Sequence, residues 1–111
     1  MKKVLLIIAV VVAVVAAIEY SVPAYEIKID KQTKKEDLKK LLSEAKENRM
    51  NIEITSVNYS EEGFVTTIEG NVLVSRFVNG SFSTSENFSS LTIHRGRGRF
   101  FPLFLVSIVN Q

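Results

Sequence analysis

The feature that most constrains this chain is a run of fifteen apolar residues, Val4 to Ile18, preceded by Met1, Lys2 and Lys3. The run has no charge and no helix breaker, and as a helix it would be apolar on every face. An amphipathic helix of a folded domain would instead carry a polar side. Positive charge ahead of such a run tends to stay on the cytoplasmic side of a membrane. The pattern therefore predicts an export segment, with the rest of the chain outside the cytoplasm.

The length of this run leaves two interpretations open. As a helix it would rise roughly 22 Å, short of the ~30 Å hydrocarbon core, and a signal-peptide core spans about 7–15 residues. The small-residue context Val14-Val15-Ala16 favours cleavage, whereas continuation to Tyr20 and Val22 favours a retained anchor. We expect residues 1–20 to be a signal peptide or a signal anchor. The protein would then be single-pass in the cell membrane with its N-terminus inside, or secreted or periplasmic after cleavage.

The composition of the exported part excludes disulfide-stabilised domains and lipoproteins and argues against nucleic-acid binding. The chain has no cysteine, so neither a disulfide framework nor a lipid-attached cysteine is available. Lys2 and Lys3 account for the net charge of +2, because the remaining twelve basic side chains are matched by twelve acidic ones. Nucleic-acid binders normally carry a basic footprint on the folded domain, so we expect no nucleic-acid partner.

Alternating and helical periodicities predict one domain over residues 25–95, after a linker at 21–24. Tyr25 to Asp30 alternates as a half-buried strand. Thr33 and Glu36 have capping-box spacing at the start of a helix that should fade near 48–50. The helix carries one apolar stripe, formed by Leu38, Leu41, Leu42 and Ala45.

The following segments favour antiparallel strands. Asn51 to Tyr59 changes phase near Thr55-Ser56, which predicts a bulge, and Phe64 to Val78 reads as one long strand. Asn79-Gly80 predicts a type I′ hairpin turn before a returning strand at 81–85, and 91–94 forms a last short strand. The expected fold is an α+β two-layer sandwich of order β-α-β-β-β, a ferredoxin-like fragment. One helix would cover a four- to five-stranded, mainly antiparallel sheet and leave its other face open.

The domain resembles a small bacterial extracytoplasmic domain at the C-terminus of antirepressor-type membrane zinc metallopeptidases, which are similar to beta-lactam sensor proteins. The resemblance rests on Ile27-Lys28-Ile29, Thr33 to Leu38, Ile52-Glu53-Ile54, Asn79 to Ser83 and Leu91 to Arg95. The peptidase's His-Glu-x-x-His helix is missing here. The resemblance therefore implies a stand-alone, membrane-delivered module without the protease, and it transfers no functional residues.

No arrangement of residues points to catalysis. His94 is the only histidine, and no cluster of Cys, His or carboxylate ligands accompanies it. Glu61 and Glu62 are adjacent carboxylates in a turn, where solubility explains them. We therefore expect no enzyme activity, no catalytic or metal-binding residue and no cofactor.

The most unusual segment is Arg95-Gly96-Arg97-Gly98-Arg99 followed by Phe100 and Phe101, within residues 96–111. One interpretation is a basic loop leading into a final strand at 103–109. Another is a basic loop and aromatic wedge that dock on anionic lipid headgroups, and a third is a tail that donates a strand to a partner. The candidate binding residues are Arg95, Arg97, Arg99, Phe100 and Phe101.

The leading hypothesis for function is a membrane-delivered, extracytoplasmic, non-catalytic binding module whose partner is an envelope protein or the membrane surface. One alternative is a regulatory accessory of a membrane peptidase or sensor. Another is a structural envelope protein that self-associates into a homo-oligomer through its open sheet face.

Overall fold

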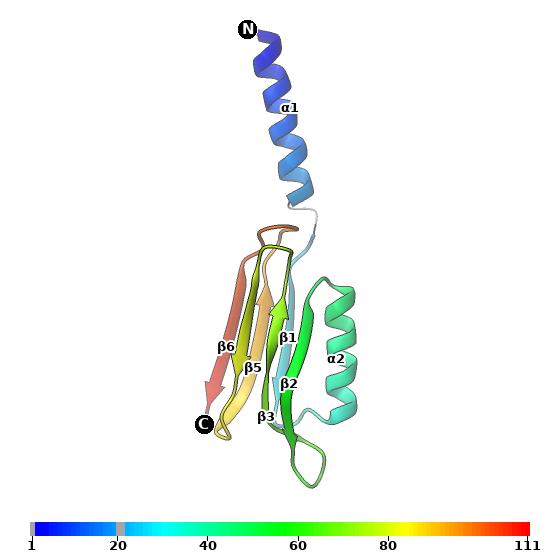
Figure 1. Cartoon of the computed structure of the whole chain (residues 1–111), viewed down its shortest axis with the longest axis vertical. Helices are drawn as coiled ribbons and strands as arrows, with labels where there is room; N and C mark the ends of the chain where they lie inside the picture. The colour runs from blue at the N-terminus through cyan, green and yellow to red at the C-terminus, as the bar shows by residue number, and fades with distance from the viewer. Residues whose placement is uncertain (1, 20–21) are drawn as a thin grey trace.

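An apolar helix followed by a mixed domain makes up the chain in the computed structural model, which describes residues 2–19 and 22–111 (Figure 1). In chain order the elements are α1 (Lys2–Glu19), β1 (Tyr25–Asp30), α2 (Lys35–Glu47), β2 (Asn51–Tyr59), β3 (Val65–Leu73), β4 (Asn79–Ser83), β5 (Phe88–Arg95) and β6 (Phe104–Asn110). The molecule measures 70 × 23 × 18 Å, because α1 extends away from one end of the domain. The expected boundary between export segment and linker falls partly at residues 20–21, outside the described residues.

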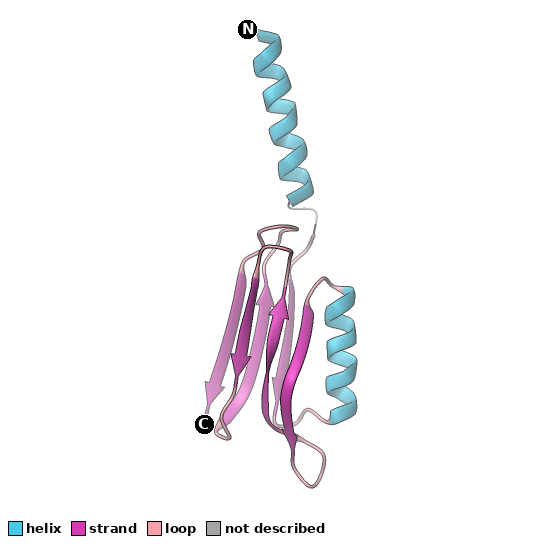
Figure 2. Ribbon diagram, viewed as in Figure 1, coloured by secondary structure: helices cyan, strands magenta, loops and turns pink. Residues whose placement is uncertain are grey.

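The strands form two antiparallel sheets, one of order β1-β5-β6 and one of order β2-β3-β4 (Figure 2). The α+β class is confirmed, but the single sheet of four to five strands is wrong. β1 pairs with β5, from Tyr25 opposite Arg95 to Asp30 opposite Ser90, rather than with the β2–β3 hairpin. Nothing local in the sequence selects this partner, because the two strands are separated by most of the domain.

The need to bury apolar sheet surface explains why the two sheets pack against each other. α2 contacts β2 and β1, each an edge strand of its sheet, so the helix lies along one side of the molecule. A 13-residue helix there leaves most of the apolar sheet surface uncovered, and the second sheet covers it. The expected open sheet face is therefore also wrong. One core joins both sheets and α2: Ile27, Ile29, Leu38, Ala45, Met50, Ile52, Val65, Ile68, Val72, Val74, Phe82, Phe88, Leu91 and Ile93.

Helix α2 has its predicted apolar stripe but begins one residue later than expected. The backbone amide of Lys34 donates to Asp37 Oδ2 at 3.4 Å, so this pair takes the positions expected for Thr33 and Glu36. Thr33 is buried instead, and its hydroxyl accepts the amide hydrogen of Asp30 at 3.1 Å. The threonine thus closes the turn after β1 rather than capping the helix. In β2 the bulge is confirmed, since the pairing register with β3 shifts between Ile54 and Ser56.

The β3–β4 reversal lies earlier than predicted. The amides of Val74 and Ser75 donate to Val78 O, and Ser75 Oγ accepts from the amides of Phe77 and Val78. Asn79-Gly80 is therefore part of β4, and the type I′ turn expected there is wrong. Gly80 serves a different need: a Cβ at this position would lie 2.4 Å from the Phe104 ring of β6.

The C-terminal segment is a strand, as one of the three interpretations predicted. β6 pairs with β5 from Phe104 opposite Arg95 to Asn110 opposite Phe88. Like β1, it is an edge strand of this sheet, and the glycine-arginine segment forms the loop before it.

α1 makes contact with the domain only near its C-terminal end (Figure 1). Its large apolar side chains from Leu6 to Ile18 are 41–68% exposed. Within residues 2–19 and 22–111, no helix combines the length and apolarity needed to cross a membrane. The signal peptide or signal anchor expected at residues 1–20 stays a prediction.

Candidate functional site

Arg95, the first of the predicted binding residues, is fully buried at the end of β5. Its guanidinium donates to three backbone carbonyls: Nη1 to Pro23 O at 2.9 Å, Nη2 to Gly98 O at 2.6 Å, and Nε to Val74 O at 3.4 Å. Burial, and to a smaller extent the Arg49 cation, lower the pKa of Arg95. Arg95 therefore fastens the linker, the end of β3 and the β5–β6 loop together, and its charge does not reach a binding surface.

The loop after Arg95 presents the remaining predicted residues. Arg97, Arg99, Phe100 and Phe101 are all exposed, whereas the two glycines between the arginines are buried. Gly98 has φ +146°, and a Cβ there would lie 2.9 Å from a Glu19 carboxylate oxygen. Glycine is thus favoured at this position by its backbone conformation, which side chains other than glycine rarely adopt.

Glu19, the last residue of α1, fixes the helix to this loop. Its two carboxylate oxygens accept the amide hydrogens of Phe100 at 3.0 Å and Phe101 at 2.9 Å. Its backbone carbonyl accepts from the Arg99 amide at 2.7 Å. Charge-assisted bonds to backbone amides are among the stronger protein hydrogen bonds. The end of α1 is therefore attached to the domain by specific contacts as well as by the chain.

Three phenylalanines gather beside this attachment. Phe77, at the tip of the β3–β4 loop, stacks on Phe101 with ring centroids 5.2 Å apart, and its centroid lies 6.3 Å from that of Phe100. Ser75 Oγ donates to Phe100 O at 2.5 Å and joins the two loops. Phe77 remains 60% exposed and Phe101 70% exposed. Exposed aromatic rings grouped in this way commonly mark a contact surface.

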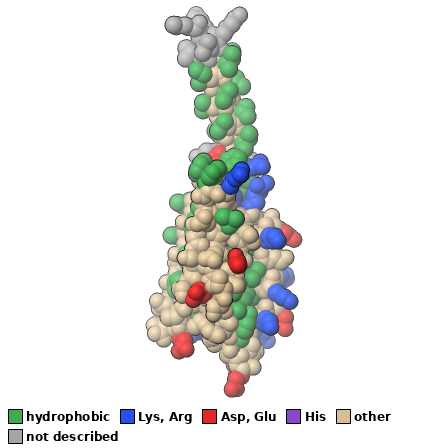
Figure 3. Space-filling view, viewed as in Figure 1, with side chains coloured by type: hydrophobic (Ala, Val, Ile, Leu, Met, Phe, Trp, Pro, Cys, Tyr) green, Lys and Arg blue, Asp and Glu red, His purple; other side chains and the backbone are tan. Residues whose placement is uncertain are grey.

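The apolar surface of α1 runs on into these rings. An apolar cavity of about 390 Å³ lies between Val15 and Ile18 of α1 and Phe100 and Phe101 of the loop. Figure 3 shows hydrophobic side chains along α1 and at the adjoining end of the domain, with Lys and Arg side chains beside them. We call this end the α1-proximal surface; it consists of Arg76, Phe77, Arg97, Arg99, Phe100, Phe101 and Leu103.

The structure thus brings four of the five predicted residues together and adds others that the sequence did not single out. Arg76 and Phe77 were assigned to the long strand ending at Val78, so their loop was missed. A signal was present, because the dipeptide Arg-Phe occurs twice, as Arg76-Phe77 and Arg99-Phe100. Glu19 was not among the predicted residues.

Among the described residues, groups capable of acid–base or metal chemistry do not gather at this surface. His94 Nδ1 lies 3.7 Å from Glu26 Oε1 across the β1–β5 pair. Within the part of the chain that the structure describes, no group of three or more His, Cys, Asp and Glu residues could hold a metal ion. The expectation that the protein is neither an enzyme nor in need of a cofactor stays a prediction.

Comparison with protein-family models, with characterised proteins and with solved structures found no match. The resemblance to the C-terminal domain of antirepressor-type metallopeptidases also stays a prediction. Function must therefore be argued from the α1-proximal surface itself.

Proposed function

We propose that the protein is a membrane-delivered, extracytoplasmic binding module that acts without catalysing a reaction, with its α1-proximal surface against the bilayer. The observation that carries this proposal is the continuity between α1 and that surface. The exposed apolar side chains of α1 lead directly to Phe100 and Phe101. An isolated apolar helix has no stable environment in water, whereas a bilayer would cover it and the rings together.

The side-chain types at this surface fit the boundary between lipid and water. Aromatic rings favour the level of the headgroups, where an apolar face and a polar neighbourhood meet. Arginine side chains interact with the anionic phosphates found at the same level. Phe77 and Phe101 would enter the interface while Arg97 and Arg99 contact headgroups. The predicted partner is thus the membrane surface, and the rest of the domain remains available to an envelope protein.

The Glu19 contacts favour an export segment that remains attached through Glu19. Cleavage beyond this residue would remove the carboxylate that accepts from the amides of Phe100 and Phe101. Intact mass of the protein from membrane and soluble extracytoplasmic fractions tests this step. A full-length mass in the membrane fraction supports a signal anchor, and a soluble product lacking Glu19 would overturn it.

A tryptophan scan tests how the domain sits on the bilayer, because the chain contains no tryptophan and each variant has a single reporter. In vesicles, Phe101→Trp should show blue-shifted emission and quenching by brominated lipids. Glu62→Trp, in the exposed β2–β3 turn, is the matched control and should emit as in water. Emission from Phe101→Trp as in water, in vesicles that hold the full chain, would contradict the proposal.

Self-association is a second candidate function, favoured by the open edge of β6. This strand has no charged residue, and Leu105 and Val109 are 58% and 52% exposed on it. An uncharged, exposed edge strand can pair with a second copy. Sedimentation of the full chain in detergent should then show a dimer that Leu105→Lys disrupts. Leu73→Lys, on the central strand β3, is the control, and a strict monomer at all concentrations would exclude this candidate.

A further inference from the structure

A pocket lined by four cations opens at the same end of the domain as α1. Its charged lining residues are Lys46, Arg49, Arg76 and Arg99, and no carboxylate lines it. The pocket has a volume of about 330 Å³. Small-molecule sites span about 300–1,000 Å³, so this pocket is large enough for a small ligand group. We call it the basic pocket.

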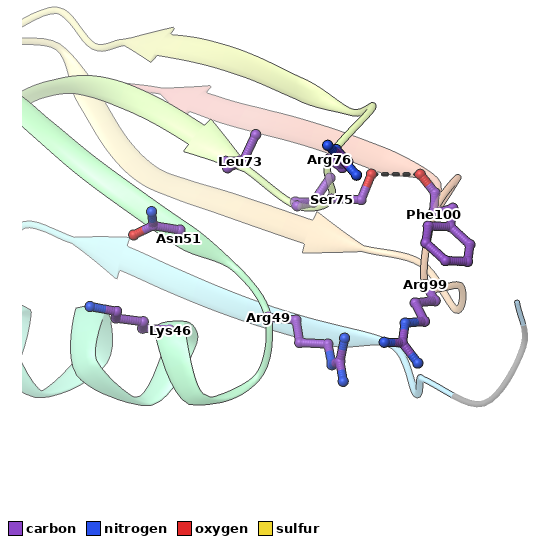
Figure 4. Close-up of a pocket in the computed structure, with 9 residues that line it drawn as sticks. Lys46, Arg49, Asn51, Leu73, Ser75, Arg76, Arg99 and Phe100 are labelled. Atoms are coloured by element: carbon purple, nitrogen blue, oxygen red, sulfur yellow. Dashed lines mark hydrogen bonds between the residues drawn. The ribbon is translucent and has the colours of Figure 1, made fainter. Parts of the chain in front are cut away.

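The cations of the basic pocket come from separate elements (Figure 4). Lys46 belongs to the last turn of α2, Arg49 to the α2–β2 connection, Arg76 to the β3–β4 loop and Arg99 to the β5–β6 loop. Within the described residues, no carboxylate pairs with Arg49, Arg76 or Arg99. A bound anion would supply the negative charge that the lining of this pocket lacks.

The backbone of Arg49 adds a second observation. Arg49 has φ +62° and is the single non-glycine residue with positive φ among those described. It follows α2 at a position where glycine is common, because side chains other than glycine are disfavoured in this conformation. The Arg49 amide donates to Lys46 O and the Met50 amide to Ala45 O, which holds the turn in place. The side chain therefore starts from a strained, well-defined backbone position at the rim of the pocket.

Stabilisation of the helix end explains only part of this cluster. Cations near a helix C-terminus interact favourably with its dipole, and Lys46 and Arg49 are placed for this. Arg76 and Arg99 belong to other loops and have no such role. Arg99 lies over the Phe100 ring, with its guanidinium carbon 5.7 Å from the centroid, so the aromatic surface orients this cation.

We propose that the basic pocket binds the phosphate group of an anionic membrane lipid. Guanidinium groups match phosphate through paired, charge-assisted hydrogen bonds, and in Figure 4 the side chains of Arg49 and Arg99 lie close together, with Arg76 across the pocket. Phe100 lines both the basic pocket and the apolar cavity beside α1, so a headgroup in the pocket would have its acyl chains on the α1 side. The choice of a lipid as the source of the phosphate rests on the proposed function, whereas the phosphate chemistry of the pocket does not.

The test uses the full chain in neutral detergent micelles, observed by the NMR signals of the arginine side chains. The probes are inorganic phosphate and phosphatidylglycerol, each titrated at constant ionic strength. We expect saturable shifts at Arg49, Arg76 and Arg99. Because each arginine contributes a charge-assisted pair, the double variant Arg49→Gln/Arg99→Gln should bind about 100-fold more weakly, about tenfold per guanidinium.

The matched control removes two charges from the exposed side of α2. Lys39→Gln/Lys40→Gln carries the same change in net charge and does not touch the pocket, so it should bind as the unchanged chain does. Arg76→Gln, in an exposed loop, provides a second variant if the double variant does not fold. Binding that survives both pocket variants, or that falls equally in the control, would overturn the proposal.

The two probes separate the sources of the phosphate. Saturation by phosphatidylglycerol alone supports a lipid headgroup, and equal affinity for inorganic phosphate supports the phosphate site but overturns its assignment to a lipid. Failure of both probes rejects the pocket. It would leave the proposed membrane contact intact if Phe101→Trp is still quenched in neutral vesicles, so the two proposals can fail independently.

Discussion

The interior of the sandwich and the α1-proximal surface use the same residue types in opposite ways. Phe88 and Arg95 are fully buried in the interior, whereas Phe101 is 70% exposed and Arg99 is exposed at the surface. In the interior every described buried side-chain nitrogen and oxygen has a hydrogen-bond partner. At the surface, Phe77 stacks on Phe101 and Arg99 lies over Phe100, yet these side chains stay exposed. The difference teaches that the polar groups of the interior are satisfied within the chain, whereas the surface leaves apolar rings that the proposed bilayer contact would cover.

The largest expected effect on stability is that of replacing Phe88, in contrast to replacing Phe101. Phe88→Ala should lower the free energy of unfolding by about 3–5 kcal/mol, because it leaves a cavity in the core. Phe101→Ala should change it by less than about 0.5 kcal/mol, as exposed positions usually do, while weakening vesicle binding. Denaturant unfolding of the full chain in detergent measures the first quantity and vesicle flotation the second. Equal losses of stability in the two variants would break the comparison.

Two arginines provide the next contrast. Arg95→Gln should cost about 2–4 kcal/mol of unfolding free energy, since carbonyls of Pro23, Val74 and Gly98 lose a charged donor. Arg99→Gln should leave stability within about 0.5 kcal/mol and reduce only phosphate binding. The same denaturation experiment compares them. If Arg95→Gln unfolds like the unchanged chain, Arg95 does not hold these three segments together as its contacts indicate.

A smaller, local effect is expected at the junction of the two regions. Glu19→Ala removes the acceptor for the amides of Phe100 and Phe101. Hydrogen exchange at these two amides should become about tenfold faster, because the loop opens more readily, while exchange in the core strands stays unchanged. Glu61→Ala, in the exposed β2–β3 turn, is the control. Unchanged exchange at both amides would show that the carboxylate does not fix α1 to the loop.

The smallest effect concerns pH. Burial, and then the nearby carboxylates Glu44 and Glu47, raise the pKa of Tyr25 above its ordinary value. A raised pKa means that the folded state favours the protonated phenol, so stability is full below the unfolded-state pKa of about 10 and falls as pH rises through the higher folded-state value. Tyr25→Phe should make the alkaline part of the stability curve flatter. An unchanged slope above about pH 10 would contradict this assignment.

Local periodicity was sufficient to predict those elements that bury one face, because their apolar residues recur at regular spacing. The stripe of α2, the alternation of β1 and the bulge in β2 follow from residues within a few positions of one another. The C-terminal strand was one of three interpretations, because an apolar stretch after a flexible loop fits a strand or a tail equally well. The pairing of β1 with β5 was beyond reach, since it depends on contacts between distant segments.

Prediction of the candidate site from the sequence was limited in the same way. Arg97, Arg99, Phe100 and Phe101 were recognised because arginine, glycine and phenylalanine alternate within seven residues. Phe77 was missed because Asn79-Gly80 was assigned the hairpin turn that Ser75 makes instead. Arg95 was grouped with its neighbours, although the three carbonyls that surround it come from segments that meet only in the folded chain.

By itself the sequence determined an apolar N-terminal helix, an α+β domain and a basic, aromatic segment before the last strand, because each depends on composition or short-range periodicity. Only the tertiary structure decided that the strands form two sheets, that Arg95 is interior and that Arg49, Arg76 and Arg99 line one pocket. Those outcomes depend on which distant surfaces cover one another. The apolar area that must be buried determines this packing, which cannot be predicted from any short stretch of residues.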